Sequence, residues 1–251
     1  TKMKNVVNES CFSDLVFCFC TVYINVCIFC GEISSLHLSK IFTNAFIVYF
    51  QSVIMSYMPG ATAVGITFDE GVVFASEKRI AYGNFLVSKS TKKTFPITPK
   101  VGATCAGLVA DMQLLSLQIS ALAKIRKMDL KRDVPPNTIA KMMSNMMYER
   151  RYFPLLTQVI VGGMTDKPVI YTLDPLGSVL PDEYAAVGTG AEMALGVLDP
   201  QFKENMNEKE ATDLAVKAVR SATMRDSFSG DGIDVLVVNK DGITEFTEDV
   251  K

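Results

Sequence analysis

The sequence predicts an α+β fold in which helices cover antiparallel β-sheets. Strand-like runs rich in Val, Ile and Phe open and close the last three-quarters of the chain, and helical segments alternate with further strands between them. Short turn signals join neighbouring strands, as in antiparallel hairpins. No GxGxxG or Walker loop follows a strand, which argues against a nucleotide-binding fold.

Five strand-like segments open this part of the chain. They are residues 62–68, 71–76, 84–93, 94–97 and 101–106. The turn signal Asp69-Glu70-Gly71 joins the first two into a hairpin. We expect the third and fourth to form a second pair, and the fifth to end at Gly107.

Helical periodicity follows. Asp111 is expected to cap a helix that runs to about Lys127. Its broad apolar face comprises Leu114, Leu115, Leu117, Ile119, Ala121, Leu122 and Ile125. Residues 135–137 begin a second helix, which is predicted to reach Tyr152 before Phe153-Pro154 stops it. Its methionines, Met142, Met143, Met146 and Met147, are expected to fill a core or an interface.

The remaining elements are strands and helices in turn. Strands are predicted at residues 156–163 and 169–173, and a short helix after Gly190. Asn207 and Glu210 have the spacing of a capping box, which marks the start of a long helix. The predicted buried face of that helix comprises Leu214, Ala215, Ala218, Ala222 and Met224. The last two strands, residues 233–238 and 243–246, flank a turn that ends at Gly242.

The composition changes near residue 55. Five of the six cysteines lie in the first 30 residues, and residues 15–31 and 41–68 carry no charge. We interpret residues 1–54 as a spurious, non-native extension or a pro-segment, with translated upstream sequence as the preferred explanation and a membrane anchor as an alternative. Met55 or Met58 is then the expected true start, and residues 55–251 form one domain.

Charge and histidine content exclude several function classes. The net charge of -2 provides no basic field for nucleic acid. A single histidine, His37, excludes an HExxH zinc site and leaves a Ser-His-Asp triad or a Cys-His dyad only one candidate base. Cys27 and Cys30 make one C-x-x-C pair, which does not make a zinc site, and we expect no metal. Cys105 lies alone in an apolar strand and is expected in the core.

Several short motifs occur in a characteristic order and spacing from Gly60 to the end of the chain. They are GATAVGI (60–66), ASEKR (75–79), AGLVAD (106–111), RYFP (151–154), GTG (188–190) and RDSFSGDGID (225–234). In order and spacing they resemble the archaeal-type 20S proteasome β subunits. The resemblance covers about three-quarters of the chain and none of residues 1–54.

The resemblance implies a four-layer αββα sandwich, the fold of the N-terminal nucleophile hydrolases. It implies assembly with proteasome α subunits and other β subunits in heptameric rings (α7β7β7α7), regulatory ATPases acting only through the α rings, and unfolded polypeptides as substrates. The expected activity is that of a threonine endopeptidase without a cofactor, in the cytoplasm.

The chemistry implied by the resemblance suits a histidine-poor chain. Cleavage after a glycine exposes an N-terminal threonine, whose α-amine titrates near about pH 8 and acts as the base. The positions carried over are Glu77, which holds Lys93 charged and oriented; Lys93, which lowers the pKa of the nucleophile; Gly107, whose N–H stabilises the oxyanion; and Thr189, Asp226 and Ser229 around the amine. Thr189 replaces the usual serine and keeps the hydroxyl.

Ala61 departs from this pattern, because it occupies the nucleophile position and has no hydroxyl. Thr62 follows, but side chains alternate along a strand, so its hydroxyl points to the other side. A cut before Thr62 would put Lys93 out of register by about 3.3 Å. We therefore predict a structural or weakly active subunit. An active peptidase using Thr62, and a membrane-tethered binding protein, are the alternatives.

The same register implies an apolar specificity pocket. Its residues are Ile80, Thr91, Cys105, Val109 and Gln113. Because none of them is acidic, the pocket predicts cleavage after hydrophobic residues if the site is active.

Overall fold

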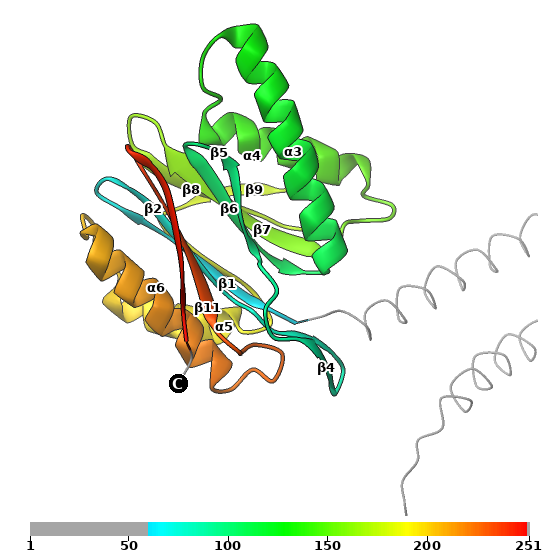
Figure 1. The fold of residues 1–251 in the computed structure, drawn as a ribbon, viewed down its shortest axis with the longest axis vertical. Helices are drawn as coiled ribbons and strands as arrows, with labels where there is room; N and C mark the ends of the chain where they lie inside the picture. The colour runs from blue at the N-terminus through cyan, green and yellow to red at the C-terminus, as the bar shows by residue number, and fades with distance from the viewer. Residues whose placement is uncertain (1–59, 250–251) are drawn as a thin grey trace, which may run out of the picture. The chain divides into compact units, whose positions relative to one another are not determined.

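The computed structural model describes residues 60–249. The interpretation of residues 1–54, including His37 and the C-x-x-C pair, lies outside the described residues. Within them, two five-stranded antiparallel sheets face each other, and a pair of helices covers the outer face of each sheet (Figure 1). This arrangement confirms the predicted αββα sandwich.

The first sheet has the strand order β10-β1-β2-β11-β12. Its strands are β10 (Tyr184–Gly188), β1 (Thr62–Phe68), β2 (Gly71–Glu77), β11 (Ile233–Asn239) and β12 (Gly242–Glu248). The predicted hairpin is present, since β1 and β2 pair from Phe68 and Gly71 onward. The pairing of β2 with β11 brings the two ends of the domain together at the centre of this sheet.

The second sheet has the strand order β5-β6-β7-β8-β9. Its strands are β5 (Thr94–Thr98), β6 (Val101–Gly107), β7 (Thr157–Met164), β8 (Pro168–Leu173) and β9 (Val179–Asp182). A separate two-stranded hairpin, formed by β3 (Ile80–Tyr82) and β4 (Phe85–Ser88), projects from one end of the sandwich (Figure 1).

Each sheet has its own helix pair. Helices α3 (Val109–Leu130) and α4 (Pro136–Glu149) pack on the second sheet, and α5 (Ala191–Gln201) and α6 (Glu208–Thr223) on the first. The capping box at the start of α6 is confirmed: Glu210 N–H donates to Asn207 Oδ1 at 2.9 Å, and Asn207 N–H donates to Glu210 Oε2 at 3.1 Å. Two unsatisfied helical N–H groups thereby gain partners.

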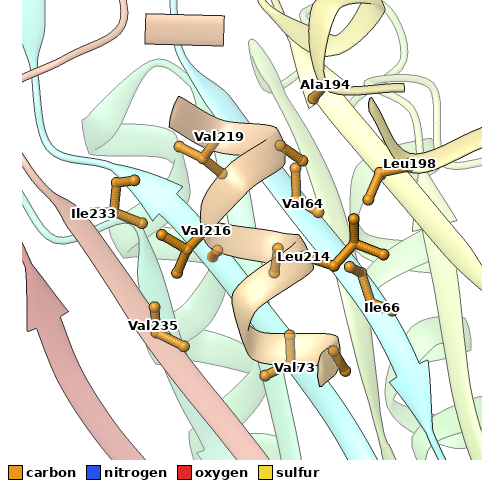
Figure 2. Packing of buried hydrophobic residues seen from close by; sticks show 14 of the residues in the cluster. Val64, Ile66, Val73, Ala194, Leu198, Leu214, Val216, Val219, Ile233 and Val235 are labelled. Atoms are coloured by element: carbon orange, nitrogen blue, oxygen red, sulfur yellow. The ribbon is translucent and has the colours of Figure 1, made fainter. Parts of the chain in front are cut away.

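Three layers of buried apolar side chains hold the sandwich together. Figure 2 shows the layer between the first sheet and its helices, where Val216 of α6 points toward Ile233 of β11 and Leu214 of α6 points toward Ile66 of β1. A second layer separates α3 and α4 from the second sheet. The third lies between the sheets and includes Phe74 and Ile160. Alternate residues of a strand therefore serve different layers.

The predicted pairing of residues 84–93 with residues 94–97 is wrong. Strand β4 ends at Ser88 and pairs with β3 through a turn at Gly83, whose φ of 55° suits glycine. Strand β5 pairs with β6 instead. The residues between β4 and β5 form no strand, because they carry Lys93 inward to a buried partner. Strands β9 and β10 were not predicted at all.

The helix boundaries also differ from the prediction. Helix α3 begins at Val109, before Asp111, and the Asp111 carboxylate instead accepts the Leu156 N–H at 2.8 Å. Its buried face is narrower than predicted, because Leu114, Leu117, Leu122 and Ile125 are exposed. Helix α4 ends at Glu149 rather than Tyr152.

The predicted apolar faces of the later helices are largely correct. On α4, Met143 and Met147 are buried in the core, while Met142 and Met146 are half-buried at its margin. On α6, the predicted face is buried except for Met224, which follows the last helical residue and is exposed.

Candidate active site

The candidate site lies where several strands begin or end at one end of the sandwich. Strand β1 begins at Thr62, directly opposite Gly188, the last residue of β10. Strand β2 ends at Glu77, opposite Ile233 at the start of β11. Strand β6 of the other sheet ends at Gly107. Backbone register alone therefore gathers residues that are far apart in the sequence.

Lys93 and Glu77 form a buried ion pair at this end. Their side chains are 2% and 0% exposed, and Lys93 Nζ donates both to Glu77 Oε1 and to the Arg79 carbonyl, the latter at 2.6 Å. Glu77 Oε2 accepts the backbone N–H groups of Arg79 at 2.6 Å and Gly230 at 3.3 Å. Each charge thus has a charged partner and additional hydrogen bonds, as buried charges require.

Burial and pairing act in opposite directions on this pair. Burial raises the pKa of the Glu77 carboxyl, and the positive charge of Lys93 opposes that rise. Burial lowers the pKa of the Lys93 ammonium, and the negative charge of Glu77 opposes that fall. Desolvation is the larger effect on the pKa in both cases, so each group relies on the opposite charge of the other to stay ionised in the buried site.

A second polar group forms around Asp226. Its Oδ2 accepts the hydroxyls of Thr189 at 2.6 Å and Ser229 at 2.7 Å, and its Oδ1 accepts the Phe228 N–H at 3.1 Å. The Thr189 hydroxyl also lies 3.3 Å from the carbonyl oxygen of Ala61. Asp226 therefore positions two hydroxyls next to the start of β1.

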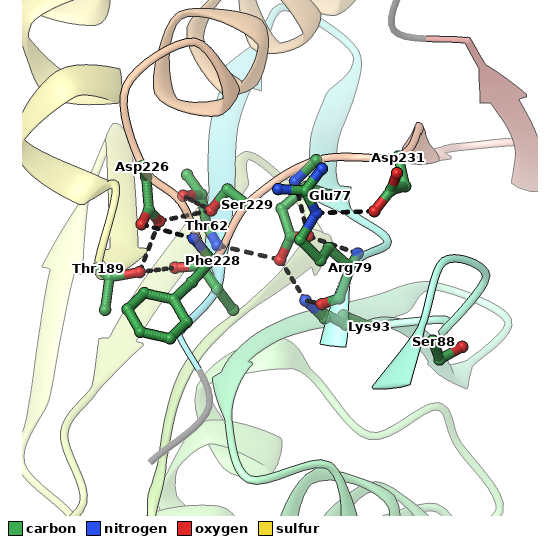
Figure 3. Close-up of polar contacts among 12 residues, drawn as sticks. Thr62, Glu77, Arg79, Ser88, Lys93, Thr189, Asp226, Phe228, Ser229 and Asp231 are labelled. Atoms are coloured by element: carbon green, nitrogen blue, oxygen red, sulfur yellow. Dashed lines mark hydrogen bonds and ion pairs between the residues drawn. The ribbon is translucent and has the colours of Figure 1, made fainter. Parts of the chain in front are cut away.

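Thr62 connects the two groups, as Figure 3 shows. Its N–H donates to Glu77 Oε1 at 3.4 Å, and its hydroxyl lies 2.7 Å from Ser229 Oγ. The side chain is fully buried, and a Cβ at Gly190, before helix α5, would lie 2.1 Å from Thr62 Oγ1. The Thr62 hydroxyl is thus enclosed between the first sheet and its helices.

Ala61 faces the opposite side. It belongs to the apolar layer between the two sheets, together with Ala106 and Ala63. The preceding Gly60 fits closely: a Cβ there would lie 2.4 Å from Phe228 Cβ and 2.7 Å from Thr189 Oγ1. The alternation predicted from sequence is therefore confirmed for Ala61 and Thr62.

Gly107 has a backbone conformation that requires glycine. Its φ is 135°, and a Cβ would lie 2.2 Å from the Leu156 carbonyl oxygen. The next residue, Leu108, donates its N–H to that same carbonyl at 2.7 Å. The last peptide of β6 is thereby held rigidly at the site end of the second sheet.

The five predicted pocket residues lie around this end, with different exposures. Ile80 is buried, Thr91 and Val109 are half-buried, and Gln113 is exposed on α3. Cys105 lies in the core under α3 and α4, where burial raises the pKa of its thiol to about 12. This thiol is a packing group, as predicted. A cavity of about 780 Å³, whose lining includes Asp69 at the β1–β2 turn, contains none of the five.

The comparisons with known proteins decide the family. The family model described as "Proteasome subunit" matches residues 58–238. The chain belongs to this family, as a β subunit of archaeal type. Over 195 residues the chain is 85% identical to "Proteasome subunit beta 1" of Nitrosopumilus maritimus. This alignment covers 78% of this chain and 98% of the relative.

Other archaeal relatives agree. The β subunit 1 of Cenarchaeum symbiosum is 78% identical over 191 residues, covering 76% of this chain and 99% of the relative. The β subunit 1 of Ignicoccus hospitalis is 44% identical over 180 residues, and the alignment covers 72% of this chain and 91% of the relative. As a proteasome β subunit, the chain is part of the 20S core particle, in which β subunits assemble in rings with α and other β subunits and provide threonine endopeptidase activity.

Two further residues of this β subunit support the site and were not predicted. Arg79 donates through Nε to Asp231 Oδ2 at 2.7 Å and through Nη1 to the Ser227 carbonyl at 3.0 Å, which holds the segment carrying Ser229 against β2. Gln158 Oε1 accepts the Gly188 N–H at 2.9 Å. Arg79 and Asp231 both lie in the motifs that carry the resemblance, which is the signal that pointed to them.

Neither a membrane span nor a metal centre is found in the described part of the β subunit. No helix within residues 60–249 is long and apolar enough to cross a membrane. The same residues contain no group of three or more His, Cys, Asp or Glu side chains placed to hold a metal ion.

Proposed function

We propose that this chain occupies a β position of the core particle without cutting peptide bonds itself. The observation that carries the proposal is Ala61, which stands at the nucleophile position and offers only a methyl group. The rings are heptameric, in the order α7β7β7α7, and degrade unfolded polypeptides in the cytoplasm. Regulatory ATPases act on them only through the α rings.

The orientation of Thr62 supports a silent site. Its hydroxyl forms a hydrogen bond with the Ser229 hydroxyl and is enclosed on the helix side of the first sheet. Ala61 lies on the other side, which faces the second sheet. For Thr62 to act as a nucleophile, the start of β1 would have to move by one residue. That shift would break the pairing of Thr62 with Gly188.

The alternative is an active peptidase that uses Thr62 after a cut behind Ala61. The intact set of Lys93, Glu77 and Asp226 favours it, because these are the groups that would activate an N-terminal nucleophile. Gly107 would then stabilise the oxyanion, and Thr189 and Ser229 would hold the amine. The apolar pocket of Ile80, Thr91, Cys105, Val109 and Gln113 would select hydrophobic residues at the cut.

We propose that residues 55–251 are the β-subunit domain and that residues 1–54 are a spurious extension or a pro-segment. Intact mass of the chain purified from assembled particles tests both proposals. An uncut chain supports the silent subunit, whereas a mature N-terminus at Thr62 supports the active alternative.

The decisive activity test replaces Ala61 in particles where this chain is the only β subunit and residue 61 is delivered as the N-terminus. We expect Ala61→Thr particles to hydrolyse a hydrophobic fluorogenic peptide and wild-type particles to be inactive. Since losing a catalytic nucleophile costs about 10⁶ in kcat in a concerted site, restoring it should raise the rate by several orders of magnitude. Ala61→Val, with the shape of threonine but no hydroxyl, is the matched control.

Two outcomes would contradict the proposal. One is wild-type activity that Thr62→Val abolishes, which would identify Thr62 as the nucleophile. The other is equal activity of Ala61→Thr and Ala61→Val, which would show that the hydroxyl at residue 61 is irrelevant. An inhibitor of N-terminal threonine should block the Ala61→Thr particles only.

A further inference from the structure

The loop that carries Lys93 has little support from secondary structure. Residues 89–93, between β4 and β5, belong to no strand. At the end of this loop, the Lys93 carbonyl accepts the Cys105 N–H of β6 at 3.0 Å. Two residues earlier, the Thr91 N–H donates to the Lys78 carbonyl at 3.1 Å. The position of the loop therefore depends on a few tertiary contacts in place of a strand ladder.

The residues next to the buried ion pair in the sequence are themselves basic and ion-paired. Lys78 follows the buried glutamate, and its Nζ lies 3.1 Å from Asp234 Oδ1 of β11. Lys92 precedes the buried lysine, and its Nζ pairs with Glu245 Oε2 of β12. Because β11 and β12 pair with each other at the edge of the first sheet, one hairpin holds a neighbour of each member of the buried pair.

The two outer ion pairs differ in exposure. The side chains of Lys78 and Asp234 are 19% and 12% exposed. Those of Lys92 and Glu245 are 47% and 37% exposed. The Thr247 hydroxyl of β12 donates to Asp234 Oδ1 at 2.7 Å and so orients that carboxylate. Since an exposed pair adds little to the free energy of unfolding, its removal can displace the loop without unfolding the domain.

A cavity beside these ion pairs gives the loop room to move. Its volume is about 380 Å³, and its lining includes all four residues of the two outer pairs, together with Ser90 and Thr94. Densely packed interiors leave no space of this size next to a buried group. Polar contacts, in place of close packing, therefore hold this side of the loop.

We propose that Asp234 and Glu245 are positioning residues for Lys93. Through Lys78 and Lys92 they hold the end of β2 and the loop before β5 together, so that the buried ammonium stays against its carboxylate. The buried pair requires this, because a buried charge that loses its partner is strongly destabilised. The proposal concerns where Lys93 lies and not whether the site cuts peptides.

Chemical labelling of lysines tests the proposal in particles assembled from the full chain and α subunits. A brief pulse of an amine-acetylating ester is followed by mass spectrometry, which gives an acetylation rate for each lysine. Lys93 should be almost unreactive in the wild type, because its side chain is 2% exposed. We expect Glu245→Gln to raise its rate roughly three- to tenfold, and Asp234→Asn added to it to raise the rate further.

The matched control is Asp133→Asn, which breaks ion pairs of similar exposure elsewhere. Asp133 lies 2.7 Å from Lys127 Nζ and 3.7 Å from Lys100 Nζ. Lys100 is in the β5–β6 turn, at the end of β5 opposite to Lys93. This variant should leave Lys93 as unreactive as in the wild type.

A charge exchange shows whether the ion pair itself is responsible. Lys92→Glu alone places two carboxylates together and should make Lys93 reactive. Lys92→Glu combined with Glu245→Lys restores an ion pair in the reverse order and should return the Lys93 rate toward that of the wild type.

The Cys105 thiol distinguishes displacement of the loop from unfolding. It lies in the core under α3 and α4 and should react with a thiol reagent only when the domain opens. In Glu245→Gln particles we expect Lys93 to become reactive while this thiol stays protected.

Three results would overturn the positioning role. They are a Lys93 rate that neither Glu245→Gln nor the double variant changes, a Cys105 thiol that reacts in step with Lys93, and an exchanged pair that leaves Lys93 as reactive as Lys92→Glu does. The labelling needs no nucleophile at residue 61, so the activity of Ala61→Thr particles bears on the proposed function only.

Discussion

Lys93 and Glu77 form the most deeply buried ion pair among the described residues. Both are almost completely removed from solvent, and each is the principal opposite charge of the other. Removing one partner of such a pair leaves an uncompensated buried charge, which is far more costly than replacing both by apolar groups. The pair is thus a structural requirement of the site even in a subunit that does not cut.

Lys93→Met should lower the free energy of unfolding by about 3–5 kcal/mol near neutral pH. Without the ammonium, the pKa of buried Glu77 rises further above its usual 4.5, so the folded state binds a proton that the unfolded state has released. The loss in free energy of unfolding therefore reaches its full size above the raised pKa of Glu77 and disappears as the pH falls below 4.5. Thermal unfolding of assembled particles across this range measures it.

The control is the double variant Lys93→Met with Glu77→Gln, which keeps an acceptor for the backbone N–H groups of Arg79 and Gly230 but carries no charge. It should be more stable than Lys93→Met alone near neutral pH and should lack this pH dependence. A single Lys93→Met variant whose deficit grows on acidification would contradict the assignment of Glu77 as the buried charge that Lys93 neutralises.

At the scale of the element, helix α6 begins at a local capping box and buries one face against the first sheet. Asn207 and Glu210 satisfy each other's backbone N–H groups, and Ala215, Ala218 and Ala222 are buried against the first sheet. Small residues on this face let the helix lie close to β1 and β2. The helix thereby covers Thr62 and supports the segment that follows it, which carries Asp226.

Asn207→Ala should lower the stability by about 0.5–2 kcal/mol, because the Glu210 N–H loses its side-chain acceptor. Asn207→Asp keeps an acceptor at the same position and should retain most of the stability. The midpoint of urea unfolding of the two variants, measured side by side with wild type, distinguishes them. Equal midpoints for Ala and Asp would show that the cap contributes nothing.

At the scale of the whole molecule, several large apolar side chains remain exposed to solvent on the surface of the subunit. On α3, Leu117 is 70% exposed and Met128 74% exposed. Figure 1 places this helix on the outside of the second sheet, and the hairpin at one end adds Phe85. Such surfaces are typical of subunits that are stable only in an assembly.

We expect the chain to be stable and folded in rings but not as a free monomer. Co-expression with α subunits followed by size-exclusion chromatography should give a large particle that contains this chain, whereas the chain alone should aggregate or unfold. A stable, folded monomer in the presence of α subunits would contradict this expectation. Leu117→Ser, which makes an exposed position polar, should improve the solubility of the chain alone.

Much of the fold follows from local sequence signals. The β1–β2 hairpin was predicted with its turn, and the Asn207–Glu210 box marked the start of α6 correctly, because the interactions that form a turn or a cap join residues a few positions apart. The pairing of β4 was predicted wrongly because the turn at Gly83 was overlooked: β3 and β4 form a local hairpin around this glycine. Strand β9 has four residues and is largely exposed, so no apolar pattern marked it. Strand β10 alternates between half-buried and buried positions, but its sequence, YAAVG, has no alternation of polar and apolar residues that could reveal this.

For the site, the sequence by itself determined the motifs, their order and the alanine at residue 61. It also determined that Ala61 and Thr62 face opposite sides, because alternation is a property of any strand. Only the tertiary structure decided that the Thr62 hydroxyl is enclosed against Ser229, that Lys93 neutralises Glu77, and that Arg79 completes the support. These contacts join residues that are distant in the sequence, and only the folding of both sheets brings them within hydrogen-bonding distance.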